Sequence, residues 1–216
     1  VDSRTDPAGA EAWCVEKLVR MDPCFLCYSP PAASPEAAIM QSHDRRHGVT
    51  FGSFNAAMKI NPRLIGVWAR LLKRVEGSRL VLKAFDFKDD PTRRRIEEAF
   101  AAEGVEPGRV EVMKPMASAA EHLAAYERVD VALDTFPSAG TTTTLEALWM
   151  GVPVVTLAGK MHAGRVGVSI LGNMGLEEFV AADEGAYIEI AAGLAGDVAR
   201  RIELRGSLRE RMRGSV

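Results

Sequence analysis

The chain has 216 residues, of which 47% are hydrophobic and 26% are charged, and its formal net charge is −2. This composition is typical of a globular protein with a substantial core. The near-neutral charge gives no electrostatic argument for binding nucleic acid. Since no apolar run approaches the ~18–20 residues that span a bilayer, we expect neither nucleic acid nor a membrane as a partner.

The first 48 residues are expected to form the end of another domain and a linker. A helical pattern covers residues 10–21, and a strand-like apolar run covers residues 25–28. A stretch rich in proline, alanine and serine, residues 29–35, and the charged residues 44–47 follow and predict a connector. Because the chain begins with a valine and ends in a charged helical pattern with no clear stop, we expect it to be a piece of a longer protein.

The cysteines and histidines give little support for a metal site. Cys24 and Cys27 have C-x-x-C spacing, but no second pair completes a zinc site, so we expect buried thiols. His43 and His47 flank two arginines that would oppose a cation. With Cys14, the cysteines are too few for a disulfide framework, which favours a reducing compartment and a cytoplasmic location.

From residue 49 onward the predicted elements alternate between strand and helix. Strands are expected over residues 49–54, 79–83, 109–113, 129–133 and 153–157, and helices over 62–75, 91–102, 118–126 and 142–150. Pro62 and Pro91 follow residues that favour helix starts, and Ser118 with Glu121 forms a capping box. Such alternation predicts an α/β fold with a parallel sheet and helices on both faces. Ligands are then expected at the carboxyl ends of the strands.

The segment between the last two predicted strands carries the clearest functional pattern. A short loop ends in Gly140, and four consecutive threonines, residues 141–144, begin the following helix. Backbone N–H groups, hydroxyls and the positive end of the helix dipole suit a phosphate group. One or two threonines there would be ordinary capping chemistry, but four exceed what a cap needs. We therefore expect a ligand of the nucleotide type.

Two common nucleotide sites are excluded by inspection. The first strand is not followed by the G-x-G-x-x-G turn of dinucleotide enzymes, and G-x-x-x-x-G-K-[ST] occurs nowhere. Hydride transfer and ATP hydrolysis therefore lose their main support.

Several spaced motifs together resemble those of the protein O-GlcNAc transferases and the related SPINDLY proteins. They are residues 51–55, 59–62, 68–69, 134–137, 140–144, 146–149 and 151–153. The resemblance runs in order along the whole chain. It implies the carboxyl-terminal half of a GT-B glycosyltransferase, with residues 49–216 as a Rossmann-like nucleotide-sugar-binding domain and residues 1–48 as the tail of the amino-terminal half plus a linker.

The resemblance also implies roles for individual residues. Lys59 matches a lysine that holds the donor diphosphate, and His122 matches a histidine beside the nucleotide base. Gly140, Thr141, Thr142 and Thr143 match the phosphate-binding helix start, and Glu146 matches an acid that bonds the ribose hydroxyls. The alternative interpretations are a solvated loop lysine for Lys59, an exposed helix residue for His122 and a first-turn acid stabilised by the helix dipole for Glu146.

Departures from the family leave the base and the sugar open. Animal relatives have glutamine, lysine, histidine and aspartate at the places of Ala56, Ala119, Thr141 and Glu146, respectively. The related SPINDLY proteins transfer fucose from a GDP donor.

Arg165 follows the last predicted strand, and we expect it either to line the cleft or to be a surface charge.

The activity that the resemblance implies is inverting transfer of a sugar, with UDP-GlcNAc as the first choice of donor, to serine or threonine of an acceptor protein. No metal or other cofactor is expected. The general base and the acceptor groove would come from the missing amino-terminal half and from tetratricopeptide repeats, so the fragment is expected to be inactive alone. A GDP-fucose or UDP-glucose enzyme, a sugar epimerase and a non-catalytic nucleotide-sugar-binding module remain alternatives.

Overall fold

A six-stranded parallel sheet organises the computed structural model, which describes residues 1–32, 34–37 and 48–215. The strands are β1 (Thr50–Ser53), β2 (Arg79–Lys83), β3 (Val110–Met113), β4 (Val131–Leu133), β5 (Val154–Leu157) and β6 (Val180–Ala181). Their order is β3-β2-β1-β4-β5-β6, and every neighbouring pair is parallel. This order places the reversal of strand sequence between β1 and β4, which is where doubly wound folds bind ligands.

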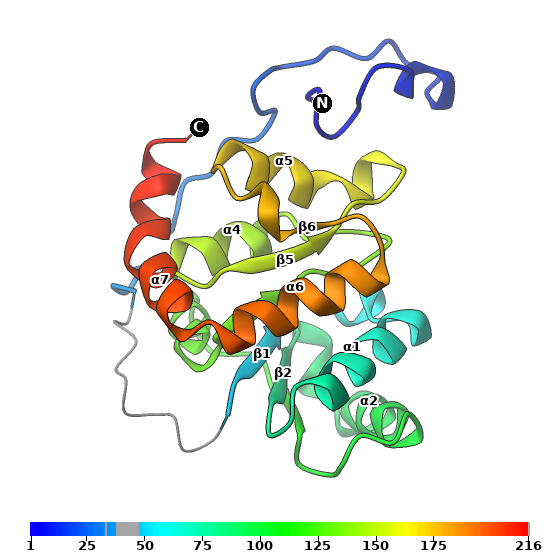
Figure 1. Ribbon diagram of the computed structural model, residues 1–216, viewed down its shortest axis with the longest axis vertical. Helices are drawn as coiled ribbons and strands as arrows, with labels where there is room; N and C mark the ends of the chain where they lie inside the picture. Colours follow the sequence, from blue (N-terminus) through cyan, green and yellow to red (C-terminus); the bar gives the residue numbers. More distant parts are fainter. Residues whose placement is uncertain (33, 38–47, 216) are drawn as a thin grey trace.

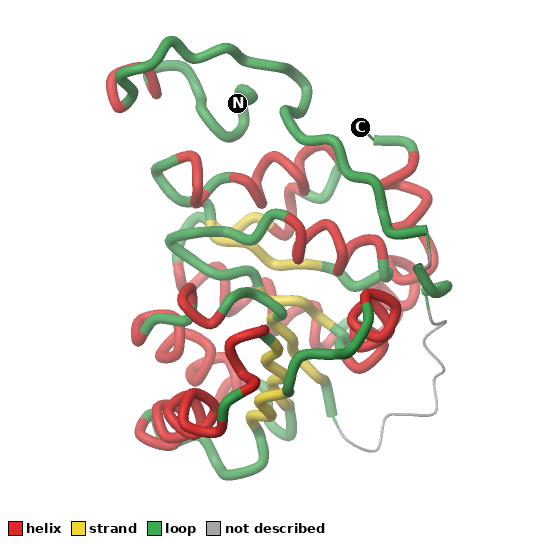
Figure 2. The backbone as a smooth tube through the Cα atoms, turned by 180° about the vertical axis from the view of Figure 1, so that it is seen from behind, coloured by secondary structure: helices red, strands yellow, loops and turns green. Residues whose placement is uncertain are grey.

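Helices cover both faces of the sheet, which confirms the predicted α/β fold class. They are α1 (Pro62–Arg74), α2 (Asp90–Ala102), α3 (Ala119–Ala124), α4 (Thr142–Trp149), α5 (Val166–Asn173), α6 (Glu184–Gly196) and α7 (Val198–Arg213). Helix α1 packs against α2 and α6 on one face, and α4 packs against α5 and α7 on the other (Figures 1 and 2). Short 3-10 turns complete the chain: η1 (Ala10–Trp13), η3 (Ala57–Lys59), η4 (Phe85–Lys88), η5 (Ala125–Arg128), η6 (His162–Gly164) and η7 (Glu177–Phe179).

Side-chain caps explain where several helices begin. The Asn61 side chain accepts a hydrogen bond from the Leu64 N–H at 3.0 Å, and Ser118 accepts one from Glu121 at 3.2 Å. Asp89 accepts one from the Thr92 N–H at 2.8 Å, so α2 begins slightly earlier than predicted. Each cap provides a partner for an N–H group that a helix leaves unpaired at its first turn.

Three buried arginines attach α7 to the rest of the domain. Arg201, Arg205 and Arg209 are all at least nine-tenths buried. Arg205 donates to the Val129 carbonyl, just before β4, and Arg209 donates to the Trp149 carbonyl at 2.9 Å. These guanidinium groups provide donors for carbonyls that secondary structure leaves unpaired.

The amino-terminal segment differs from the prediction. Of the helix expected over residues 10–21, the structure contains only the turn η1, and residues 25–28 form no strand. The large apolar side chains of this segment are exposed, so a helix there would have no tertiary contacts to bury an apolar face. They are Trp13, Val15, Val19 and Met21. Cys27 is exposed as well, and the prediction that it is a buried thiol is wrong.

This segment lies across α5 (Figure 1), where polar side chains hold it. The Asp2 carboxylate, fully buried, accepts hydrogen bonds from the Ser169 hydroxyl and from the Thr5 N–H. Arg4 donates to the Gly172 carbonyl at 3.3 Å. Residues 44–47 of the expected connector, with His43 and His47, lie outside the described residues.

Within the described part of the chain, no helix is both long and apolar enough to cross a membrane. The elements that the sequence did not predict are α5, β6 and α6, which follow the last predicted strand.

Candidate functional site at the carboxyl ends of the strands

Lys59 lies beside the loop that leads into α4. Its Nζ atom donates a hydrogen bond to the Ala139 carbonyl at 2.9 Å, next to Gly140. Asn61 donates from Nδ2 to the Phe136 carbonyl at 2.9 Å. The turn η3 after β1 and the loop after β4 are therefore joined, and an ammonium group is placed close to the amino-terminal end of α4.

The buried Asp134 side chain holds the same loop through hydrogen bonds. It is 1% exposed and accepts hydrogen bonds from the N–H groups of Gly140 and Thr135 and from the Thr156 hydroxyl, at 2.7, 2.9 and 2.9 Å. Burial raises the pKa of Asp134 to about 6, although these hydrogen bonds oppose the rise. The Tyr187 hydroxyl, which is bonded to Trp68, donates to the Asp134 carbonyl at 2.8 Å.

The four threonines divide into two pairs. Thr143 donates its hydroxyl to Asn55 Oδ1 at 3.1 Å, and the buried Thr144 donates its hydroxyl to the Gly140 carbonyl at 2.8 Å. Thr141 is the N-cap residue but makes no capping hydrogen bond with its side chain, and Thr142 is exposed. The first turn of α4 thus presents Thr141 and Thr142 at the open edge, while Thr143 and Thr144 fix the turn in place.

His122, on α3, lies beside Glu146, which is one helical turn beyond Thr142 on α4. His122 Nε2 is 2.9 Å from Glu146 Oε2, and their side chains are 30% and 15% exposed. The rings of Phe54 and Tyr126 meet the His122 ring edge-on, at centroid distances of 6.1 and 6.0 Å. A half-buried imidazole and a carboxylate that can accept further hydrogen bonds therefore stand beside the start of α4.

Lys83 adds a cation that the sequence analysis missed. It is the last residue of β2, is 3% exposed, and its Nζ contacts His122 Nδ1. Burial lowers its pKa to about 8, while Glu146 opposes this shift. A lysine at the end of β2, at the edge where ligands are expected, was the sequence signal that could have indicated it.

Asn55 and Asp134 were also missed as individual site residues. Each lies just after a strand, Asn55 two residues beyond the end of β1 and Asp134 directly after β4, at the edge where ligands are expected. Their partners across the loop became visible only in the folded chain.

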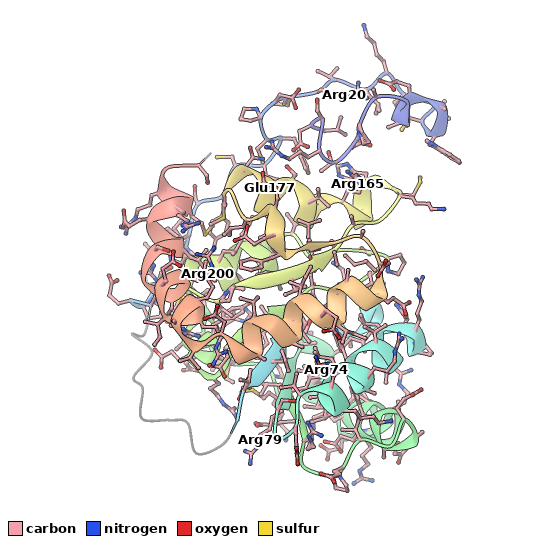
Figure 3. All side chains as sticks on the ribbon, viewed as in Figure 1. Arg20, Arg74, Arg79, Arg165, Glu177 and Arg200 are labelled. Carbon is pink, nitrogen blue, oxygen red and sulfur yellow. The ribbon has the colours of Figure 1, made fainter. Side chains whose placement is uncertain are left out.

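Arg165 lies away from this group. Its guanidinium donates to the Arg4 carbonyl at 2.9 Å and to the Gly159 carbonyl at 3.2 Å. Figure 3 shows it between the amino-terminal segment and the rest of the domain. Arg165 therefore attaches the amino-terminal segment to the loop after β5.

The edge also carries a groove of about 740 Å³ on the side of β5 and β6. Phe136 and Pro137, from the loop before α4, line it together with Arg63 and Lys160. No group of three or more side chains suited to a metal ion occurs among residues 1–32, 34–37 and 48–215.

Sequence comparisons find relatives that match most of this chain. Residues 37–216 match the profile of glycosyl transferase family 41. A protein of Arabidopsis thaliana named "Probable UDP-N-acetylglucosamine--peptide N-acetylglucosaminyltransferase SPINDLY" is 46% identical over 216 residues, which are 99% of this chain and 23% of the relative. A UDP-N-acetylglucosamine--peptide N-acetylglucosaminyltransferase of Caenorhabditis elegans is 31% identical over 160 residues, 74% of this chain and 14% of the relative.

Structural comparisons give the same grouping. A mutant of the Thermobaculum terrenum O-GlcNAc transferase matches with a TM-score of 0.91 and 39% identity, over 99% of this chain and 40% of that one. The carboxyl-terminal domain of a group 1 glycosyl transferase from Francisella tularensis matches with a TM-score of 0.58 at 14% identity, which shows a shared fold. The chain thus spans less than half the length of these longer relatives.

Proposed function

Because the chain belongs to glycosyl transferase family 41 and has the fold of the carboxyl-terminal half of a GT-B enzyme, we propose that it binds the nucleotide sugar in an inverting protein glycosyltransferase. The donor in this proposal is UDP-GlcNAc, and the acceptor is a serine or threonine hydroxyl of a protein. The observation that carries the proposal is the Lys59 ammonium beside Ala139 and Gly140, at the start of α4.

In the proposed reaction, the acceptor hydroxyl attacks the anomeric carbon of the sugar, and the nucleoside diphosphate leaves with its bonding electron pair. Negative charge then grows on the diphosphate. In this proposal Lys59 and the backbone N–H groups of residues 141–143 stabilise that charge. The contacts that hold the loop from both sides support the proposal, because a preorganised site needs little rearrangement. No resident metal or cofactor has a part in this scheme.

The nucleoside is assigned to the neighbouring side of α4. His122 offers a ring face next to the base, and Glu146 offers a carboxylate oxygen to the ribose hydroxyls. The general base and the acceptor groove are assigned to the amino-terminal half of the longer enzyme, with tetratricopeptide repeats as further acceptor-binding elements.

Calorimetry on the purified chain tests the donor site. We expect UDP to bind about 10–100-fold more tightly than uridine, since charge-assisted hydrogen bonds to the phosphates contribute about 1.5–3 kcal/mol. Equal affinities for UDP and uridine would remove the phosphate site. A preference for GDP over UDP would move the donor to GDP-fucose, the alternative that the resemblance to SPINDLY proteins supports.

A further inference from the structure

Lys83 is a buried cation at the edge of the proposed nucleotide site. Its side chain closes β2, is 3% exposed, and lies 4.4 Å from the centre of the Phe54 ring. Burying an ammonium group is unfavourable unless partners compensate for its lost hydration. Because so little of Lys83 is accessible, it acts on a ligand only through the residues that it contacts.

The hydrogen-bonding capacity of those residues fixes where the protons are. A lysine ammonium has three donors and no acceptor. Its contact with His122 Nδ1 therefore requires this nitrogen to be the acceptor. The imidazole proton is then on Nε2, which donates to Glu146 Oε2 at 2.9 Å. Lys83, His122 and Glu146 form a chain in which each donor faces an acceptor.

From this chain we propose that Lys83 is a positioning residue of the nucleotide site, which holds His122 as the neutral Nε2–H tautomer with its ring set against Glu146. The proposal rests on the function proposed above. Without Lys83, His122 is free to protonate Nδ1, either as the other tautomer or as an imidazolium beside Glu146. In each case the ring loses the contact that fixes its orientation beside the base.

The state of His122 can be measured without any ligand. Long-range proton–nitrogen correlation spectra of the purified chain distinguish a protonated ring nitrogen from an unprotonated one, and the spectrum of His122→Gln assigns the signals among the four histidines. At pH 7 we expect an unprotonated Nδ1 and a protonated Nε2. In Lys83→Met we expect a tautomer mixture or a charged ring. Lys83→Arg, which keeps donors at this place, should restore part of the Nε2–H form.

Lys73→Met is the matched control, because Lys73 is exposed and donates to a single carbonyl, that of Glu103. It should leave the His122 spectrum unchanged. A wild-type His122 that carries its proton on Nδ1, or a Lys83→Met spectrum identical to that of the wild type, would overturn the proposal. A thermal melt checks folding, which we expect to survive because methionine is an apolar side chain of similar volume.

Measurements of UDP binding provide the second part of the test. By calorimetry, we expect Lys83→Met to weaken UDP binding about tenfold, as one well-placed hydrogen bond would, and Lys73→Met to bind as the wild type does. Unchanged UDP affinity in a Lys83→Met chain whose His122 tautomer has shifted would refute the positioning role. Failure of the wild type to bind any nucleoside diphosphate would instead refute the proposed function, while the spectra would still decide the tautomer.

Discussion

At the scale of single residues, Asp134 connects the stability of the fold to the shape of the site. Its ordinary pKa is near 3.8, and burial raises the value in the folded protein to about 6. Between these two pH values the folded protein binds more protons than the unfolded chain. The contribution of Asp134 to the free energy of unfolding therefore falls, by roughly 3 kcal/mol, as the pH rises through this window.

Asp134→Asn should remove this dependence on pH. The amide oxygen can still accept from the N–H groups of Gly140 and Thr135, and the Thr156 hydroxyl can accept from the amide nitrogen. In urea unfolding between about pH 4.5 and 7, the wild type should lose stability relative to Asp134→Asn as the pH rises. Curves that stay parallel for the two proteins would show that Asp134 keeps an ordinary pKa.

Lys59→Met tests the role of the ammonium group in catalysis. In a full-length enzyme that contains this chain, we expect kcat with saturating donor to fall by about 10²–10³, the usual effect of losing one transition-state donor. Lys59→Arg should recover only part of the lost kcat. It keeps the positive charge, but a planar guanidinium does not fit the place of a compact ammonium. A thermal melt beside the assay and Lys73→Met as control separate catalysis from folding. A near-normal kcat in Lys59→Met would contradict the catalytic role and support the alternative interpretation of Lys59 as a solvated loop lysine.

At the scale of elements, two helical glycines have opposite surroundings. A Cβ atom on Gly167, in α5, would lie 2.4 Å from Thr156 Oγ1 and 2.9 Å from Asp134 Oδ2. The exposed Gly193, in α6, has no atom within 4 Å of such a Cβ atom. The first glycine permits close packing of α5 on the sheet below the site, and the second has no such requirement.

Alanine substitutions should therefore change stability in opposite directions. We expect Gly167→Ala to lower the free energy of unfolding by about 1–3 kcal/mol through overpacking. Gly193→Ala should raise it by about 0.5–1 kcal/mol, because alanine reduces the freedom of the unfolded chain within a helix. Urea unfolding measures both. Equal effects of the two substitutions would mean that the close approach at Gly167 does not limit packing.

Most elements of the sheet could be predicted because their signals are local. The strand over 79–83 has its predicted bounds. Helix α1 begins at the predicted residue, since Asn61 and Pro62 mark its start clearly, and it ends within one residue of its prediction. The two-residue strand β6 is too short to show a periodic pattern. The helix expected over residues 10–21 was wrong because helical spacing in so short a segment forms a helix only where tertiary contacts bury one face.

The site was predictable only in part, for a related reason. Glycine and threonine spacing before α4 indicates an anion site from local chemistry alone. The contacts of Lys59 with Ala139 and of Thr143 with Asn55 depend on strands far apart in the chain. Lys83 was missed because the local sequence of β2, which also begins with a charged residue, does not indicate that its last side chain will face His122 and not solvent.

At the scale of the whole molecule, several large apolar side chains remain uncovered at the carboxyl edge. Met58 in η3, Phe85 in η4 and Met161 after β5 are 90%, 71% and 55% exposed. Each follows a strand at the edge that carries the site. An amino-terminal catalytic half facing this edge, as the proposed function requires, would cover such surfaces.

The isolated chain should therefore bind a nucleoside diphosphate but transfer no sugar. The proposed general base and acceptor groove belong to the other half of the enzyme, and donor binding cannot replace them. Incubation of the purified chain with labelled donor and acceptor protein should give no product above a control without enzyme. Measurable turnover would show that catalytic groups lie within these 216 residues.

The pairing of β1 with β4 has a consequence for how the domain forms. Strands β1 to β3 and strands β4 to β6 can each pair with neighbours close in the chain, whereas Lys59 with Ala139 and Asn55 with Thr143 are 80 and 88 residues apart. Closing a loop of that length costs roughly 4 kcal/mol of chain entropy. Contacts of such high sequence separation slow folding. A diphosphate held between Lys59 and the start of α4 would bind only after this closure and would stabilise the closed state by mass action. The ligand would therefore favour the last step of folding, in which the two halves of the sheet come together.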